Sequence, residues 1–190
     1  KDGDTFDDVC ALALTQHDEL LARCEAFEKE LLAKAAPYGE KYCDIIALAY
    51  RQAIAAHKLT WDGESLQFLS KECYSNGCIG TVDVTYPSIP LFLLYQPDLV
   101  CGMLDPIFRY AASDAWPFRY APHDVGQYPL ANGQVYGMGE KYKNKEGGEE
   151  ANQMPVEECG NMLLCVAAVC KAKNSTEYAE KHFEVLQQWV

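Results

Sequence analysis

The sequence predicts a mainly α-helical protein built from antiparallel helix pairs, with one small β-hairpin inserted between them. Three observations support this fold class. Apolar residues recur at helical spacing in three parts of the chain, proline and glycine divide each part into two arms, and one short segment instead alternates around an Asp-Gly dipeptide. With 190 residues, of which 49% are hydrophobic, we expect a single domain over residues 1–190.

The first helix pair is expected near the N-terminus. Thr5, followed three residues later by Asp8, is a helix-start signal, and residues 6–34 then carry the apolar spacing of an amphipathic helix. Residues 37–39, Pro-Tyr-Gly, break this helix, and residues 42–57 resume a more apolar helical pattern. The short break predicts an antiparallel hairpin.

The next segment has strand character. Residues 59–70 alternate in polarity around Asp62-Gly63, and Asp-Gly between alternating residues is a strong short-range signal for a β-hairpin. We therefore expect a two-stranded excursion between the helices.

A second helix pair follows. Pro87 and Pro90 precede the apolar residues 91–95, and Pro97 opens residues 98–113. Proline in a first helical turn costs no hydrogen bond, because its missing N–H would have had no partner in the helix. The very short link predicts a second hairpin.

Residues 114–153 show no sustained period of either kind. A stretch of this length in a compact domain is usually functional or mobile. We expect residues 116–136 to be ordered by their aromatic side chains and residues 142–152 to form a solvated loop.

Residues 154–173 and 175–189 predict a third hairpin. Residues 162–170 are apolar on every face, which is typical of a helix buried on all sides, whereas residues 175–189 are amphipathic. Outer and inner helices thus alternate, as in an α/α toroid.

Composition excludes several classes of partner. The net charge of −12 argues against nucleic acid and anionic membranes as partners, because phosphate groups are bound mainly by Lys and Arg. No apolar run approaches the roughly 20 residues that cross a bilayer. Glycine-rich phosphate loops and CxxC pairs are absent, so we expect no nucleotide cofactor and no metal.

Nine cysteines are present, most of them in apolar helical patterns where a free thiol behaves as a small hydrophobe. We expect mostly reduced, buried thiols. Cys73 and Cys78 are the best candidates for a disulfide.

Three polar, acid-bearing segments lie beside helix-forming sequence: residues 75–88, residues 121–126 and residues 154–162. Polar groups at the ends of helices are how a helical scaffold builds a cleft. These segments therefore supply the candidate site residues.

Glu157 and Glu158 fall in an early helical turn, where the helix dipole favours an ionised carboxylate. Acids are common there simply as partners of the dipole. Glu158, however, shares one helical line with the apolar Met162 and Cys165, which predicts an inward carboxylate, whereas Glu157 aligns with Asn161.

Asp83 is the third candidate acid. It lies between Val82 and Val84, and a carboxylate buried near apolar surface must be paired, hydrogen-bonded or protonated. It could instead hold the Gly80-Thr81 bend. Facing one of the glutamates, it would form the carboxylate pair that hydrolysis needs, in which one acid activates water and the other protonates the leaving group.

Substrate-binding side chains are expected among the remaining polar residues of these segments and of the aromatic loop. Histidine titrates nearest neutral pH, which draws attention to the loop pair His123-Asp124, although a structural loop histidine is common. The aromatic residues could form a small core or a stacking platform. The candidates are Asn76, Thr81, His123, Asp124, Tyr128 and Asn161.

The three segments, together with residues 128–137, resemble the six-helical-hairpin domain of the glutaminase A family, from about Tyr42 to the C-terminus. The resemblance implies about half of an (α/α)6 toroid, with about three of the six hairpins. It also implies hydrolysis of L-glutamine to glutamate and ammonia, a secreted or periplasmic location, and a longer parent chain that supplies an N-terminal domain and the other half of the toroid.

In this reading, our hypothesis is that Glu157 or Glu158 activates water, Asp83 assists the leaving amine, and Asn161 with His123-Asp124 orients the substrate. Two alternatives stay open. A glycoside hydrolase-like domain would use the same acids on a sugar, and a non-catalytic interaction module would self-associate through exposed inner-helix surface.

Overall fold

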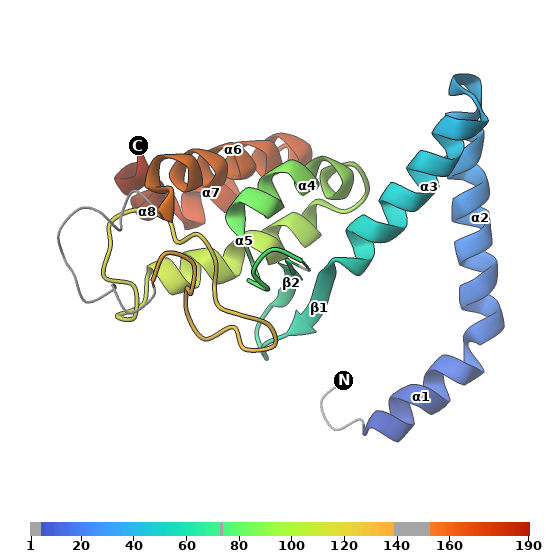
Figure 1. Ribbon diagram of the computed structural model, residues 1–190, viewed down its shortest axis with the longest axis horizontal. Helices are drawn as coiled ribbons and strands as arrows, with labels where there is room; N and C mark the ends of the chain where they lie inside the picture. The colour runs from blue at the N-terminus through green and yellow to red at the C-terminus, as the bar shows by residue number, and fades with distance from the viewer. Residues whose placement is uncertain (1–4, 73, 139–152) are drawn as a thin grey trace. The chain divides into compact units, whose positions relative to one another are not determined.

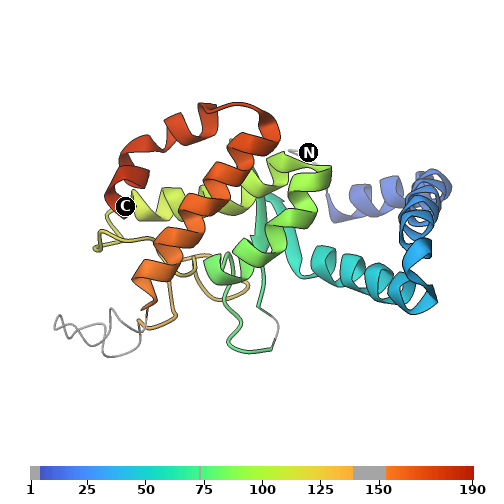
Figure 2. The same ribbon diagram turned by 90° about the horizontal axis from the view of Figure 1, so that it is seen from above.

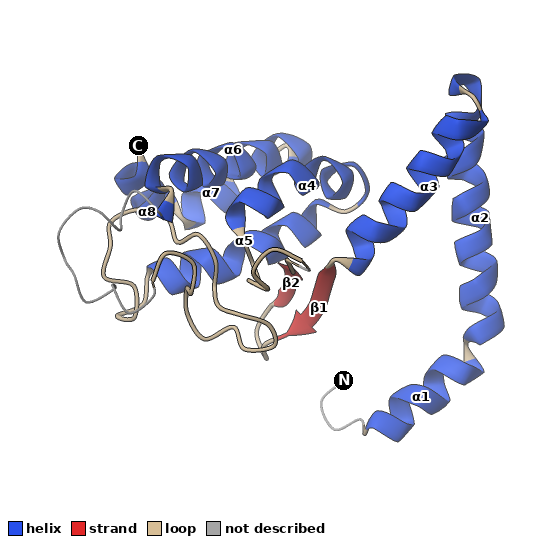
Figure 3. Cartoon of the chain, in the orientation of Figure 1, coloured by secondary structure: helices blue, strands red, loops and turns tan. Residues whose placement is uncertain are grey.

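The computed structural model describes residues 5–72, 74–138 and 153–190. The chain divides into two compact units, Lys1–Ile54 and Ala55–Val190, and each is described by itself. The described residues are mainly helical with one two-stranded sheet, which confirms the predicted fold class (Figure 1, Figure 3). The expected single domain over residues 1–190 stays a prediction.

The first unit is helical. Its elements are α1 (Phe6–Thr15), α2 (His17–Ala35), the 3-10 turn η1 (Ala36–Tyr38) and most of α3 (Glu40–Ala55). Thr5 and Asp8 form a reciprocal capping box at the start of α1, as the sequence indicated. The helix expected over residues 6–34 is interrupted at Gln16, because the backbone there leaves helical geometry (φ −95°, ψ 1°).

The β-hairpin opens the second unit. Strands β1 (His57–Trp61) and β2 (Leu66–Ser70) pair antiparallel, with His57 opposite Ser70. Asp62 Oδ1 accepts hydrogen bonds from the backbone N–H groups of Glu64 (2.9 Å) and Ser65 (2.8 Å), which closes the connection. The hairpin that the Asp-Gly dipeptide predicted is confirmed.

Five helices complete the second unit. They are α4 (Val82–Tyr95), α5 (Pro97–Ala111), α6 (Pro155–Lys173), α7 (Glu177–Lys181) and α8 (Phe183–Trp189). Helices α4, α5 and α6 pack against one another, and α5 also packs against β2 (Figure 2). The helix expected over residues 175–189 is divided at His182. Within the described residues, no helix is long and apolar enough to cross a bilayer.

Helix α4 begins earlier than expected. It starts at Val82, not after the prolines, so that Pro87 and Pro90 lie inside it. The first turn still closes, because the Thr85 N–H donates to the Thr81 carbonyl (2.9 Å). Each interior proline lacks an N–H and leaves the carbonyl four residues earlier without its usual helical donor. As a consequence, Asp83 belongs to the first turn of a helix.

One hydrophobic core joins α4, α5, α6, β2, α8 and the loop around Val125. Helix α6 buries Met162, Cys165 and Val169 in this core, but Leu164 is 55% exposed. Residues 162–170 were expected to be buried on every face. This expectation is wrong for Leu164, because the helices packed on α6 cover only part of its circumference.

The thiols divide by position. Cys78, Cys159 and Cys165 are free and buried, whereas Cys10 and Cys24 are free and exposed, which corrects the expectation of general burial. Cys73 lies outside the described residues, and so does its expected pairing with Cys78.

Gly102 permits the close approach of α5 to β2. A Cβ at this position would lie 3.0 Å from the Leu66 carbonyl oxygen and 3.2 Å from the Phe68 backbone nitrogen. We expect Gly102→Ala to lower the free energy of unfolding by about 1 to 3 kcal/mol, because the strand and helix must separate slightly. Urea denaturation measures this loss.

Gly160→Ala in α6 is the matched control. A Cβ there meets nothing within 4 Å, so the higher helix propensity of alanine should raise the free energy of unfolding by about 0.5 to 1 kcal/mol. A Gly102→Ala protein as stable as the original would contradict the close packing of α5 on β2.

Candidate functional site

Backbone hydrogen bonds fasten the loop of residues 121–126 to the segment that enters α4. The Val82 N–H donates to the His123 carbonyl (2.8 Å), and the Ile79 N–H donates to the Gly126 carbonyl (2.8 Å). The Val125 N–H donates back to the Ile79 carbonyl (3.0 Å). These bonds hold His123 beside the first turn of α4, which carries Asp83.

The His123 side chain is 2% exposed and is held from several directions. Its ring stacks on the Tyr136 ring, with centroids 4.2 Å apart, and its backbone N–H donates to Gln134 Oε1 (2.7 Å). Its Nδ1 lies 3.0 Å from Asp124 Oδ2. Because a carboxylate only accepts, Nδ1 carries the hydrogen, and in the neutral tautomer that this bond selects, Nε2 presents a lone pair.

Asp124 is fully buried and fixes this arrangement. Besides the imidazole, it accepts hydrogen bonds from the backbone N–H groups of Gly126 (2.9 Å), Val135 (3.2 Å) and Tyr136 (3.2 Å). Asp124 was expected to bind substrate, but the structure uses its oxygens to join two loop segments and to orient His123.

The free nitrogen of His123 faces two acids. Nε2 lies 3.8 Å from Asp83 Oδ1 and 3.9 Å from Glu158 Oε1. Neither carboxylate oxygen has a hydrogen-bond partner among the described residues, and both distances exceed a direct hydrogen bond. The first turns of α4 and α6 and the loop at His123 therefore bring two carboxyl oxygens within 4 Å of one imidazole nitrogen.

Glu158 is fully buried, as its alignment with apolar residues predicted. Burial raises the pKa of its carboxyl to about 9, and the nearby charge of Asp83 adds to this effect. The hydrogen bond from Asn161 Nδ2 to Glu158 Oε2 (3.4 Å) lowers this pKa but offsets the increase only partly. The sequence led us to expect an ionised glutamate, but removal from water outweighs the helix dipole, so Glu158 is protonated at neutral pH.

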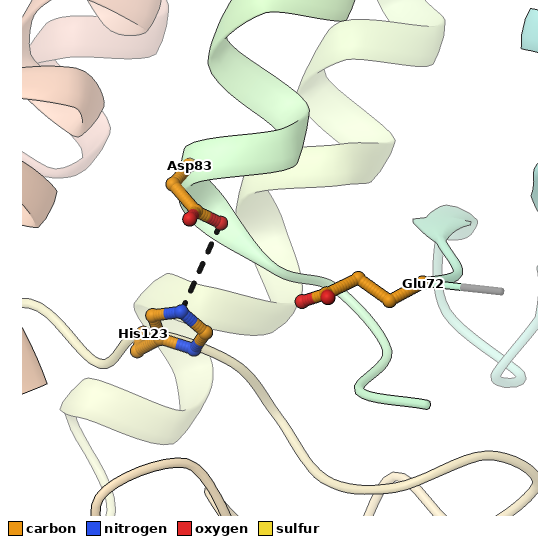
Figure 4. A group of neighbouring side chains, drawn as sticks. All are labelled: Glu72, Asp83 and His123. Carbon is orange, nitrogen blue, oxygen red and sulfur yellow. Dashed lines mark ion pairs between the residues drawn. The ribbon is translucent and has the colours of Figure 1, made fainter. Parts of the chain in front are cut away.

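Glu72 was not predicted and joins the group from the segment after β2. One ligand atom each of Glu72, Asp83 and His123 lies within 4.8 Å of the others (Figure 4). The Asp83 side chain is 33% exposed and Glu72 is half-buried, so solvent reaches the group from their side. No local pattern distinguishes Glu72, because an acid in the segment that follows a hairpin is ordinary.

Two other expected residues lie beside the group. Thr81 is fully buried at the start of α4, and its Oγ1 has no hydrogen-bond partner among the described residues. Asn161 is buried and contacts Glu158. Both were expected to bind substrate, and both are within one turn of a candidate acid.

Three expected residues are not brought into the group. Glu157 is exposed on α6. Asn76 Oδ1 accepts a hydrogen bond from the Cys78 N–H (2.8 Å), which is a turn-forming role. Tyr128 is 45% exposed, with Lys71 Nζ 4.4 Å from its ring centroid.

The arrangement suits acid–base chemistry. A carboxyl group whose pKa is raised and a partly exposed carboxylate both lie within 4 Å of one imidazole nitrogen, and together these groups can accept one proton and donate another. Among the described residues, His123 is the only basic side chain within 4 Å of the carboxyl groups of Asp83, Asp124 and Glu158.

Comparison with known proteins gives three similarities. The family model described as the glutaminase A six helical-hairpin domain matches residues 39–190. Glutaminase A of Aspergillus oryzae (strain ATCC 42149 / RIB 40) is 36% identical over 152 residues, which are 80% of this chain and 20% of that protein. A protein named "Probable glutaminase" from Arthroderma benhamiae (strain ATCC MYA-4681 / CBS 112371) is 36% identical over 127 residues, 66% of this chain and 13% of that protein.

The chain thus spans a fifth or less of the length of these two relatives. No solved structure matches it. These similarities therefore concern the family and the names of the relatives. What the site can do chemically follows from its own geometry.

Asp124→Asn should lower the free energy of unfolding by roughly 3 kcal/mol, because one amide oxygen cannot accept every hydrogen bond that the carboxylate accepts, and buried donors lose their partner. Urea denaturation measures this loss. Asp98→Asn is the control: Asp98 pairs with Lys173 at the surface, so its loss should stay below about 1 kcal/mol. Equal losses in the two variants would contradict a structural role for Asp124.

Proposed function

We propose that this chain, which belongs to the glutaminase A six-helical-hairpin family, hydrolyses the side-chain amide of glutamine through Asp83, His123 and Glu158. One observation carries the proposal. The oriented imidazole nitrogen of His123 lies 3.8 Å from Oδ1 of the partly exposed Asp83 and 3.9 Å from Oε1 of the buried Glu158, whose pKa burial raises to about 9. Amide hydrolysis needs such an acceptor and donor of protons close together.

The reaction sets the demands on these groups. A water oxygen bonds to the amide carbon, the carbon–nitrogen bond breaks, and glutamate and ammonia leave. One proton must be taken from the attacking water, and one must reach the departing nitrogen, because NH2⁻ is too poor a leaving group. A proton acceptor and a proton donor are therefore both required.

Position and pKa support an assignment of these roles. Glu158 holds a proton at neutral pH, since burial raises its pKa to about 9, and this makes it the donor to the departing nitrogen. The accessible side, formed by Asp83 and His123, activates the attacking water. The sequence had suggested the reverse, with a glutamate activating water and Asp83 assisting the amine.

Glu158→Gln tests the donor. Glutamine keeps the size of the side chain but has no acidic proton, so kcat for glutamine should fall by about 10²- to 10⁴-fold. Ammonia release from L-glutamine by the complete gene product is the measurement.

Glu157→Gln is the matched control on the same helical turn. This acid is exposed and lies outside the group, so its variant should keep kcat within about twofold. Equal activity of the Glu158→Gln protein would remove Glu158 from the mechanism. Hydrolysis of aryl glycosides with no ammonia release from glutamine would overturn the amidase reaction in favour of a glycosidase.

A further inference from the structure

We propose that Glu72, Asp83 and His123 form a binding site for a divalent transition-metal ion such as Zn²⁺ or Mn²⁺. Their ligand atoms lie within 4.8 Å of one another, and they come from the segment after β2, the first turn of α4 and the loop at residues 121–126. Figure 4 shows the three side chains pointing toward a shared space. The sequence indicated no metal because these ligands form no spacing motif along the chain.

The donor set fits such an ion. Imidazole suits zinc and other transition metals, and carboxylate oxygens are ligands of both zinc and manganese. Metal–ligand bonds of about 2.0 to 2.2 Å place adjacent ligand atoms about 3 to 4 Å apart. His123 Nε2 and Asp83 Oδ1 are already 3.8 Å apart. The half-buried Glu72, whose Oε2 accepts a hydrogen bond from the Ser75 hydroxyl, would close the rest of the distance with its side chain.

His123 is prepared as a ligand by its surroundings. A metal-bound histidine usually donates its second N–H to a carboxylate or a carbonyl, which fixes the tautomer and the ring orientation. The Asp124 carboxylate accepts this hydrogen bond at 3.0 Å, while backbone N–H groups hold Asp124 in place. The stacked Tyr136 ring further limits rotation of the imidazole.

Glu158 provides an independent observation. This side chain is 0% exposed, and its Oε1 has no hydrogen-bond partner among the described residues although it points toward His123 Nε2 at 3.9 Å. An unpartnered buried oxygen is costly, and so is the similarly unpartnered Oδ1 of Asp83. An ion held by Asp83 would partner Oδ1, and a water on that ion would partner Glu158 Oε1.

Charge and access agree with this occupant. Two carboxylates and one neutral imidazole balance a divalent ion, and within the described residues His123 is the only basic side chain within 4 Å of the Asp83 carboxylate. Because Asp83 and Glu72 are partly exposed, an ion can enter and one coordination position can stay open to water, as in catalytic sites.

A metal ion at this site would take part in the reaction proposed above. Only this catalytic role of the ion rests on the proposed function. The Asp83–His123 side was assigned to activate water, and a bound divalent ion lowers the pKa of its water toward 7. Binding itself requires no reaction and can be measured without substrate.

Isothermal titration of the metal-stripped 190-residue chain with ZnCl2 and, separately, MnCl2 tests the proposal. At least one of the two ions should bind at one ion per chain, and saturation should raise the thermal midpoint by about 5 °C or more. His123→Ala should abolish this binding. Glu72→Gln should weaken metal binding at least tenfold. Because Glu72 is partly exposed, this variant should preserve the fold.

His17→Ala is the matched control, because exposed His17 lies beside Asp18 (2.9 Å) and represents a chance histidine–acid pair. Its variant should bind the ion unchanged. Failure of both ions to bind would overturn the site, and so would binding that survives Glu72→Gln and His123→Ala or is lost in His17→Ala. Intact binding without ammonia release would refute the proposed function and leave the metal site standing.

Discussion

The site depends on one buried interaction, the hydrogen bond between His123 and Asp124. Asp124 gathers backbone N–H groups from residues 126, 135 and 136, so a single carboxylate joins two loop segments that lack secondary structure of their own. The same carboxylate fixes the imidazole tautomer and aims Nε2 at the acids. A long loop becomes a rigid part of the site because its buried polar groups satisfy one another.

The helices mainly set the positions of the acidic side chains in the site. The packed core of α4, α5 and α6 sets the first turns of α4 and α6 near each other, and these turns carry Asp83 and Glu158. Side chains at the first turn project beyond the helix end, where a loop can meet them. The backbone bonds between Val82 and His123 and between Ile79 and Gly126 then bring the loop to that end.

Electrostatics give the group its character. Acids outnumber bases around His123, and Glu158 is the buried acid whose pKa desolvation raises, so its proton relieves part of the repulsion. A divalent ion on the exposed side would relieve the rest. The raised pKa of Glu158 beside the Asp83 carboxylate and the His123 imidazole is compatible with the amide hydrolysis that we propose, because that reaction needs a proton donor and a proton acceptor.

The sequence by itself determined the helical class, the β-hairpin, the start of α1 and the inward direction of Glu158, because each depends on spacing or capping among neighbouring residues. It also singled out Asp83 and the His123-Asp124 pair by residue type and local context. Only the tertiary structure decided that Asp83 and Glu158 both approach the His123 imidazole, that Glu72 lies close to Asp83 and His123, and that Glu157 stays outside the group. It also decided the protonation of Glu158, since the free energy of desolvation depends on the atoms packed around a carboxyl group and not on its position along a helix.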